Sequence, residues 1–262
     1  AMAERVADAA ERIGYRTRAL IPTREAAARP GMSFGFVLQK QAQAFYQNFA
    51  TALEAAVAAR TDIDGRCHIR FTNSPSPDDF ASALDALAPH SDAIGAVATN
   101  HQRLTQKVRM LREDGTPVFA LLNDFAQGER DGYLGLNNIT VGRLAAWMLT
   151  TRLHSPGKLA VFVGSSRWHS HVLRETGFQS YLRERKPDFE MLPAMVNLDT
   201  RQLTYEATLD LLNRQPDLRG IYVAGGGMEG AIAAIREVRP PGKVALVVNE
   251  LTDTSRAALA DR

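Results

Sequence analysis

The chain has 262 residues, of which 45% are hydrophobic and 23% charged, and its 31 basic and 29 acidic residues leave a formal net charge of +2 at pH 7. This length is too great for one small core and fits two lobes of roughly 100 to 150 residues each. The charge balance excludes a polyanion-binding surface spread over the whole molecule. No apolar run approaches the ~20 residues needed to span a bilayer, so we expect no membrane partner.

The amino-terminal segment differs from the rest in charge, because residues 1–31 hold six arginines and only four acids. Such a segment is compatible with a nucleic-acid contact and equally with ordinary solvation. The arginines are Arg5, Arg12, Arg16, Arg18, Arg24 and Arg29.

The single cysteine, Cys67, lies in a strand-like segment and is typical of a buried structural thiol. One cysteine excludes an internal disulfide and fits a reducing compartment. The amino terminus also lacks the basic-then-apolar layout of a secretory signal. We therefore expect a cytoplasmic location.

From Met32 onward, short apolar runs alternate with helical patterns. In the first half, the pattern predicts strands at 32–39, 67–73, 93–99 and 117–123, and helices at 44–60, 77–89 and 102–114. A short strand at 133–138 follows a polar loop. In the second half, helices are predicted at 140–153, 171–185, 201–214 and 229–238, and strands at 158–166, 190–197, 220–227 and 243–250. Trp147 falls within a helical stripe and is expected in the core.

Strands that are continuous hydrophobic runs, each followed by a helix, indicate parallel sheets covered on both faces. The units are too many for one small sheet, and segment 133–138 divides them into roughly equal halves. The sequence therefore predicts an α/β fold of two Rossmann-like, doubly wound lobes with a ligand cleft between them, in preference to a single barrel.

Polar residues stand at most of the predicted carboxyl-terminal strand ends, where α/β folds place their ligands. Short amide, hydroxyl and carboxylate groups in such number suit a polyhydroxylated ligand. These residues are Gln39, Asn73, Asn100, Asn123, Asp124, Asn137, Asn138, Ser165, Ser166, Asn197, Asn249 and Glu250.

The motifs of catalysis and metal binding are missing from the sequence. The glycine run 225–227 lacks the spacing of a dinucleotide-binding loop, so a tight turn or a close ligand approach is the better interpretation. No zinc-ligand spacing and no G-x-S-x-G elbow occur. Asp199 or Glu250 could act as a general acid or base, but no reacting partner is identifiable. We therefore expect no catalytic residues, no metal and no cofactor.

Several side chains are suited to binding a sugar-like molecule. Phe45 and Tyr46, at the start of a helix, could stack on an apolar sugar face or simply pack against the sheet, and the same choice applies to Trp168. Arg174 could donate paired hydrogen bonds to ligand oxygens or form a surface salt bridge.

The order and spacing of several segments resemble the LacI/GalR-type (lactose-repressor family) transcription regulators over nearly the whole length. "ERVADAAERIGYRTRAL" resembles the last helix of the family's DNA-binding headpiece and the segment leading to its hinge. "AFYQNFATALEAA" and "GYLGLNNITVGRLAAWML" resemble segments of its effector-binding core. "HVLRETGF" matches an R-x-x-G-F pattern, and "VVNELTDTSRAAL" is similar to a strand-end segment of one branch, with Asn249 in place of a histidine.

This resemblance implies a type I periplasmic-binding-protein-like core without catalysis, working as a homodimer on operator DNA. It assigns effector binding to His171 and Arg174, with Trp168 and His169 lining the entrance. The domains are then a headpiece and hinge remnant at 1–31, an amino-terminal lobe at 32–136 and a carboxyl-terminal lobe at 137–262. The first two headpiece helices are absent, the usual hinge sequence is not reproduced, and such a fold is expected to continue beyond residue 262.

The sequence therefore favours the effector-binding core of a regulator that binds a sugar, polyol or sugar acid. The alternative is a periplasmic solute-binding protein of a sugar transporter, which has the same lobes, and an enzyme on a doubly wound sheet is the third hypothesis. The expected ligand contacts are Phe45, Tyr46, Asp124, Asn138, Trp168, His171, Arg174, Asn197 and Glu250.

Overall fold

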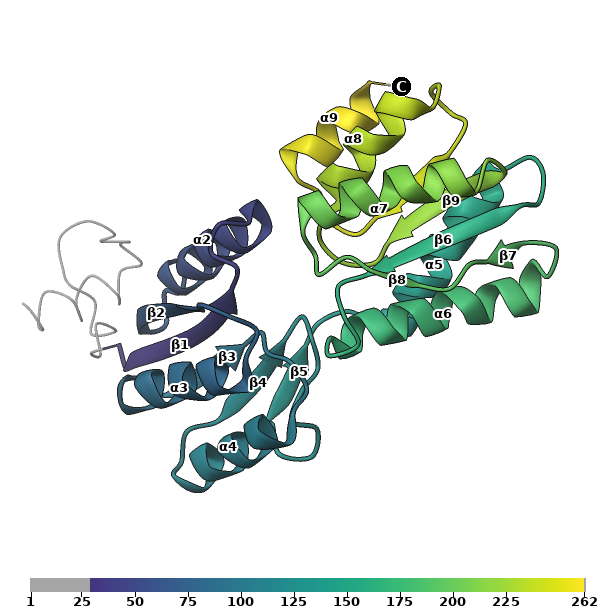
Figure 1. The fold of residues 1–262 in the computed structure, drawn as a ribbon. Coiled ribbons are helices and arrows are strands. Elements are labelled where there is room, and N and C mark those ends of the chain that lie inside the picture. Colours follow the sequence, from purple (N-terminus) through teal and green to yellow (C-terminus); the bar gives the residue numbers. More distant parts are fainter. Residues whose placement is uncertain (1–28, 262) are drawn as a thin grey trace, which may run out of the picture.

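A computed structural model describes residues 29–261 of the chain. Almost all of the predicted headpiece and hinge segment, residues 1–28 of it, therefore lies outside the described residues. The remainder forms two α/β lobes, each built on its own sheet (Figure 1). Among the helices of residues 29–261, none combines the length and apolar character that crossing a bilayer requires.

The first lobe contains a five-stranded parallel sheet in the order β2-β1-β3-β4-β5. Its helices cover both faces, with α2 on one side and α3 and α4 on the other (Figure 1). A short 3₁₀ turn, η1 (Ala88–His90), follows α3. The element bounds are β1 Gly31–Gln39, α2 Ala44–Ala58, β2 Asp64–Thr72, α3 Pro77–Leu87, β3 Ala93–Ala96, α4 Gln102–Glu113, β4 Val118–Leu121 and β5 Gly132–Leu134.

The second lobe repeats this architecture, with strands in the order β10-β9-β6-β7 and β8 pairing with β6, all parallel. Helices α5 and α6 lie on one face, and α7 and α8 on the other (Figure 1). The bounds are α5 Asn138–Arg152, β6 Lys158–Val163, α6 His169–Arg185, β7 Glu190–Met191, β8 Met195–Val196, α7 Arg201–Arg214, β9 Leu218–Val223, α8 Met228–Val238, β10 Ala245–Val248 and α9 Asp253–Ala260. The predicted fold class, parallel sheets flanked by helices, is confirmed.

Strand β6 shows why the apolar runs are continuous. Its side chains alternate between the two faces of the sheet. Leu159 and Val161 pack into the cluster under α5 and α6, whereas Ala160 and Phe162 pack into the one under α7 and α8. Because both faces are buried, neither position can be polar.

Several local predictions differ from the structure, among them one strand and one core residue. The strand predicted at 190–197 is divided into β7 and β8 around Pro193, because proline offers no N–H to a sheet ladder. Trp147 is 49% exposed on α5, not in the core as predicted, and Leu144 and Met148 are exposed beside it. The buried side of α5 is formed by Gly142, Ala145, Ala146 and Leu149, not by this tryptophan.

Two glycines allow α5 and α6 to pack closely. A Cβ atom at Gly142 would collide with the backbone carbonyl of Arg174, and one at Gly177 would collide with the carbonyl of Ile139. The backbones therefore approach each other as only glycine permits. This packing places Arg174 next to the start of α5.

We expect Gly142→Ala to destabilise the fold, because the added methyl group meets backbone that cannot move aside cheaply. Overpacking of this kind costs about 1 to 3 kcal/mol, more than the helix gains from alanine. Urea unfolding of the variant measures the loss. Gly31→Ala is the matched control, since a Cβ there meets nothing within 4 Å; an equal effect at both positions would contradict the packing argument.

Candidate functional site

The carboxylate of Asp199 lies where the two lobes meet. Strand β8 ends at Val196. One residue further on, Leu198 and Asp199 both adopt left-handed backbone conformations, with φ of 51° and 54°. Non-glycine residues rarely take this conformation, and it turns the side chain back over the strand ends. Oδ1 of Asp199 accepts a hydrogen bond from the backbone N–H of Gly226 at 2.9 Å, and Oδ2 accepts one from Nζ of Lys40 at 3.2 Å.

Two glycines make room for this carboxylate. A Cβ atom at Gly164, after β6, would overlap both carboxylate oxygens of Asp199. One at Gly225, after β9, would overlap Oδ1 of Asp199 and lie 2.5 Å from Cε1 of His171. The glycine run therefore makes room for a close approach, and the approaching group is the protein's own carboxylate, where the sequence suggested a tight turn or a ligand.

The first lobe reaches Asp199 through the loop between β1 and α2. Lys40, itself left-handed at φ 49°, also donates from Nζ to the carbonyl of Leu198 at 3.3 Å. Gln43 is the N-cap residue of α2, but its side chain makes no capping hydrogen bond. Instead, its Nε2 donates to the carbonyl of Asp199 at 3.0 Å. We call Lys40, Gln43 and Asp199 the interlobe clasp.

A second bridge anchors the start of α6 to the first lobe. Oδ1 of Asn123 accepts from the backbone N–H of Ser170 at 2.8 Å, and its Nδ2 donates to the carbonyl of Ala98 at 2.7 Å. Trp168, only 6% exposed, packs with the apolar cluster of the first lobe. The helix that carries His171 and Arg174 is thus held from both sides.

Arg174 is oriented by two fixed acceptors. Its Nε donates to Oδ1 of Asn138 at 2.7 Å, and one terminal nitrogen donates to the carbonyl of Ala224 at 2.6 Å. The amide of Asn249 donates to the same carbonyl at 2.8 Å, which joins the ends of β9 and β10 to α6. Within the described residues, the second terminal nitrogen of Arg174 makes no hydrogen bond.

His171 is buried and neutral. Burial lowers the pKa of its imidazole to about 4, although the nearby Asp199 carboxylate favours the charged form. Nδ1 accepts from the backbone N–H of Gly164 at 3.1 Å, so the single ring proton resides on Nε2. That N–H is a donor without a partner among the described residues.

Glu250 and Tyr46 face the same space. Burial, followed by the negative charges of Glu229 and Asp199, raises the pKa of Glu250 to about 7, while Arg174 opposes the shift. The Tyr46 hydroxyl accepts from Nε2 of Gln39. Burial raises its pKa as well, and Asp199 and Glu250 add to the rise. We refer to these groups as the interlobe cluster: Lys40, Tyr46, His171, Arg174, Asp199 and Glu250.

Five of the predicted contacts lie in this cluster or directly against it. They are Tyr46, Asn138, His171, Arg174 and Glu250. Asn138 belongs through its hydrogen bond to Arg174, and it is itself 4% exposed.

Asn197 and Trp168 differ from their predicted roles. Asn197 is fully buried, and its Nδ2 donates to Thr204 and to the carbonyl of Gly226, so it holds the second lobe together. Trp168 was expected at an entrance, but its indole fills the core of the first lobe. In both cases the position after a strand indicated the right edge of the sheet without giving the direction of the side chain.

Asp124 lies apart from the cluster, and Phe45 borders it only through Tyr46. The carboxylate of Asp124 is engaged by Arg130 at 3.0 Å and by Gln127 at 2.8 Å. Phe45 sits edge-on against Tyr46, with ring centroids 5.1 Å apart, and stacks on Phe49. Tyr46 and Phe49, not Phe45, pack against the first lobe's core.

Sequence reasoning omitted Lys40 and Gln43 and considered Asp199 only as a general acid or base. Lys40 follows a predicted strand end directly, which was the available signal. Within residues 29–261, no group of three or more His, Cys, Asp or Glu side chains is arranged to hold a metal ion.

Comparison with known proteins identifies the architecture. The family model of the periplasmic binding protein domain matches residues 34–262. No curated protein matches the chain. An ABC-transporter solute-binding protein from Agrobacterium vitis, bound to α-D-tagatopyranose, has a TM-score of 0.76 at 22% identity, covering 88% of this chain and 80% of that one.

Two further solved structures are similar. The arabinose-binding protein AraP from Geobacillus stearothermophilus gives a TM-score of 0.71 at 22% identity, over 88% of this chain and 79% of its own. A solute-binding protein from Burkholderia graminis in complex with D-arabinose gives 0.78 at 16% identity, over 89% and 81%. At such identities the likeness shows a shared fold.

The raised pKa of Glu250 predicts a pH dependence of stability. Because the pKa rises from 4.5 in the unfolded chain to about 7 in the folded one, the folded state binds the proton more tightly. Stability therefore falls as the pH rises from 4.5 to about 7, by up to roughly 3 kcal/mol, and stays lower above it. Glu250→Gln should remove this decline, which urea unfolding at acidic and alkaline pH measures. Glu113→Gln, on the exposed side of α4, is the control, and an unchanged decline in Glu250→Gln would refute the assignment.

Proposed function

Because the chain belongs to the periplasmic binding protein domain family, we propose that it binds a small polyhydroxylated molecule, a sugar, polyol or sugar acid, between its two lobes. The observation that carries this proposal is the interlobe cluster. It gathers side chains from both lobes at the carboxyl ends of their strands, where α/β folds bind ligands. We propose binding without chemical conversion.

The free hydrogen-bonding capacity of the cluster supports a sugar-like ligand. Nε2–H of His171 and a terminal nitrogen of Arg174 are donors without partners among the described residues. The carboxyl group of Glu250 is an acceptor that likewise has no hydrogen-bond partner among the described residues. Hydroxyl groups both donate and accept, so a polyhydroxylated ligand suits this mixture of donors and acceptors.

The charges of the cluster favour a ligand of low net charge. Lys40 and Arg174 stand against Asp199 and Glu250. The charges of Lys40, Arg174 and Asp199 act on the pKa of both His171 and Glu250. A strongly anionic ligand would meet two carboxyl groups in a poorly solvated space. The half-buried ring of Phe45 lies next to Tyr46 and extends the apolar side available to a sugar face.

The role of this binding is a second question, with two candidate answers. The comparisons favour a solute-binding protein that serves a sugar transporter, because the similar structures are named as such. The resemblance of residues 4–20 to the end of a DNA-binding headpiece favours the regulator instead. A regulator would act in the cytoplasm as a homodimer on operator DNA. Residues 4–20 lie outside the described part of the chain.

We predict that Arg174→Ala weakens ligand binding ten- to a hundredfold while the protein stays folded. A charge-assisted hydrogen bond to a bound ligand contributes about 1.5 to 3 kcal/mol. A thermal-shift screen against sugars, polyols and sugar acids identifies the ligand, and calorimetry gives the affinities. Arg185→Ala, exposed in the last turn of the same helix, is the matched control. Equal affinity of wild type and Arg174→Ala would remove Arg174 from the site.

The two roles predict different behaviour of the complete gene product. As a regulator, it should bind a pseudo-palindromic site upstream of its own operon with nanomolar affinity, and the ligand should change that affinity. As a solute-binding protein, it should show no sequence preference for DNA, and deletion of its gene should abolish uptake of the radiolabelled ligand. Anisotropy titration and whole-cell uptake separate the two outcomes.

A further inference from the structure

We propose that the first lobe carries a second ligand site, a pocket of about 420 Å³ that binds the phosphate group of a small phosphorylated metabolite. The pocket lies at the amino-terminal ends of the strands, whereas the interlobe cluster follows their carboxyl ends. Lys40 follows Ser33 of the pocket by seven positions along and just past β1, which corresponds to roughly 23 Å of extended chain. The two sites are therefore independent.

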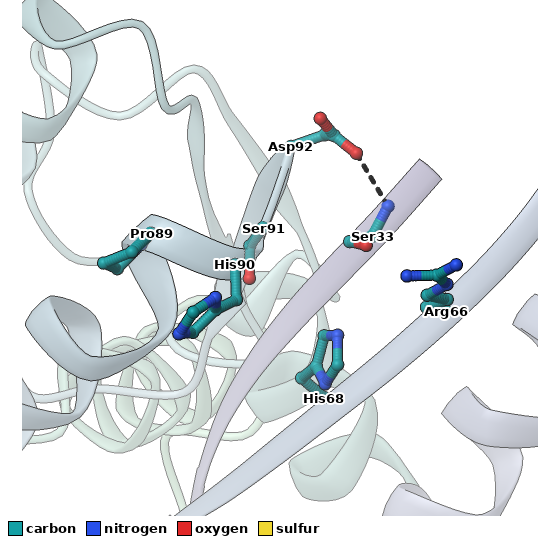
Figure 2. A pocket seen from close by; sticks show the side chains of 7 residues that line it. All are labelled: Ser33, Arg66, His68, Pro89, His90, Ser91 and Asp92. Atoms are coloured by element: carbon teal, nitrogen blue, oxygen red, sulfur yellow. Dashed lines mark hydrogen bonds between the residues drawn. The ribbon is translucent and has the colours of Figure 1, made fainter. Parts of the chain in front are cut away.

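The lining of the pocket is rich in hydrogen-bond donors and basic side chains. Arg66 and His68 project from the edge strand β2, and His90 faces them from η1 across β1 (Figure 2). Among the described residues, no carboxylate forms an ion pair with Arg66, including Asp64 on the same strand face. The residues of the lining are Ser33, Arg66, His68, Pro89, His90, Ser91 and Asp92.

The one carboxylate of the pocket is already engaged. Oδ2 of Asp92 accepts from the backbone N–H of Ser33 at 2.7 Å, which ties the start of β3 to β1 (Figure 2). This bond directs one carboxylate oxygen toward backbone and away from the basic side chains. The arginine and the two histidines thus outnumber the acid, whose carboxylate is the one negative group of the pocket lining.

Ser91 adds an unsatisfied polar group. Its hydroxyl oxygen is buried and has no hydrogen-bond partner in the described part of the chain. It lies against Gly35, where a Cβ atom would come within 2.6 Å of it. A buried hydroxyl without a partner is destabilising, so a ligand that supplies a partner is favoured. Ser91 is also one of the residues that line the pocket.

A phosphate monoester fits these features better than other ligands. The planar guanidinium of Arg66 matches two phosphate oxygens, and imidazole and hydroxyl donors supply the rest. A volume of about 420 Å³ exceeds the needs of inorganic phosphate and lies in the range of small-metabolite pockets. The pocket's histidines and Asp92 form no metal-binding group. Its lining is confined to seven residues of β1, β2 and the segment from η1 to β3, which suits a terminal phosphate better than the continuous backbone of a nucleic acid.

The test is isothermal titration calorimetry of the protein with D-glucose 6-phosphate, with D-glucose and inorganic phosphate as separate arms. We expect glucose 6-phosphate to bind with a dissociation constant near or below about 1 mM. Arg66→Gln and His68→Gln should each weaken it at least tenfold. Arg70→Gln is the matched control, because Arg70 lies on the same face of β2, equally exposed, and outside the lining. Arg174→Ala, which disables the proposed interlobe site, should leave glucose 6-phosphate binding unchanged.

Each other outcome also decides the question. Equal binding of inorganic phosphate and glucose 6-phosphate supports the phosphate site with free phosphate as its source. Absence of binding by both overturns the proposal, as does a loss caused by Arg174→Ala or an equal loss in Arg70→Gln. If a DNA duplex binds through Arg66 and glucose 6-phosphate does not, the surface belongs to a nucleic acid. Failure here leaves the interlobe proposal intact, since D-glucose and the sugar panel test that site separately.

Discussion

The arrangement of the interlobe cluster depends on the burial of one carboxylate, that of Asp199. A buried carboxylate is costly unless hydrogen-bond donors and a positive charge compensate it. The backbone N–H of Gly226 and the ammonium of Lys40 supply both, from different lobes. The left-handed backbone at Asp199 is tolerated because these bonds hold it in place. The same interaction therefore shapes the second lobe's strand ends and joins them to the first lobe.

The buried carboxylate of Asp199 restricts which residues can stand next to it. Gly164 and Gly225 lack side chains because Asp199 and His171 occupy the space that a Cβ would need. Gly142 and Gly177 make room in the same way between α5 and α6. They let the two helices approach closely enough for Arg174 to hydrogen-bond to Asn138. Rigid packing of backbone thus orients the polar groups, and their free donors need no rearrangement to meet a ligand.

Burial also sets the protonation of the cluster. His171 is neutral at physiological pH because burial lowers its pKa more than the nearby Asp199 carboxylate raises it. Burial disfavours the anionic form of Glu250 and raises its pKa to about 7. The lobes therefore meet around the cations of Lys40 and Arg174, the anion of Asp199 and one group whose charge varies in the physiological range. A ligand that hydrogen-bonds to Glu250 would couple its affinity to pH.

The sequence by itself determined the fold class and the edge of each sheet where polar groups gather. Unbroken apolar runs are possible only in strands buried on both faces, and glycines and polar residues after them indicate the carboxyl ends. The sequence named Glu250 as a candidate from its strand end and Tyr46 as an aromatic residue at the start of a helix. The resemblance to the LacI/GalR-type regulators implied His171 and Arg174. The R-x-x-G-F spacing also reflects a real constraint, since Gly177 allows the approach that positions Arg174.

Only the tertiary structure decided which polar groups face the interlobe space and which are engaged elsewhere. Asn197 and Asp124 occupy strand ends like those of the cluster, yet their side chains are taken by neighbours within their own lobes. Trp168 crosses into the core of the other lobe, and Lys40 crosses to Asp199, which lies 159 residues away in the chain. Such pairings depend on side-chain direction and on the placement of the two lobes, which no local pattern of residues encodes.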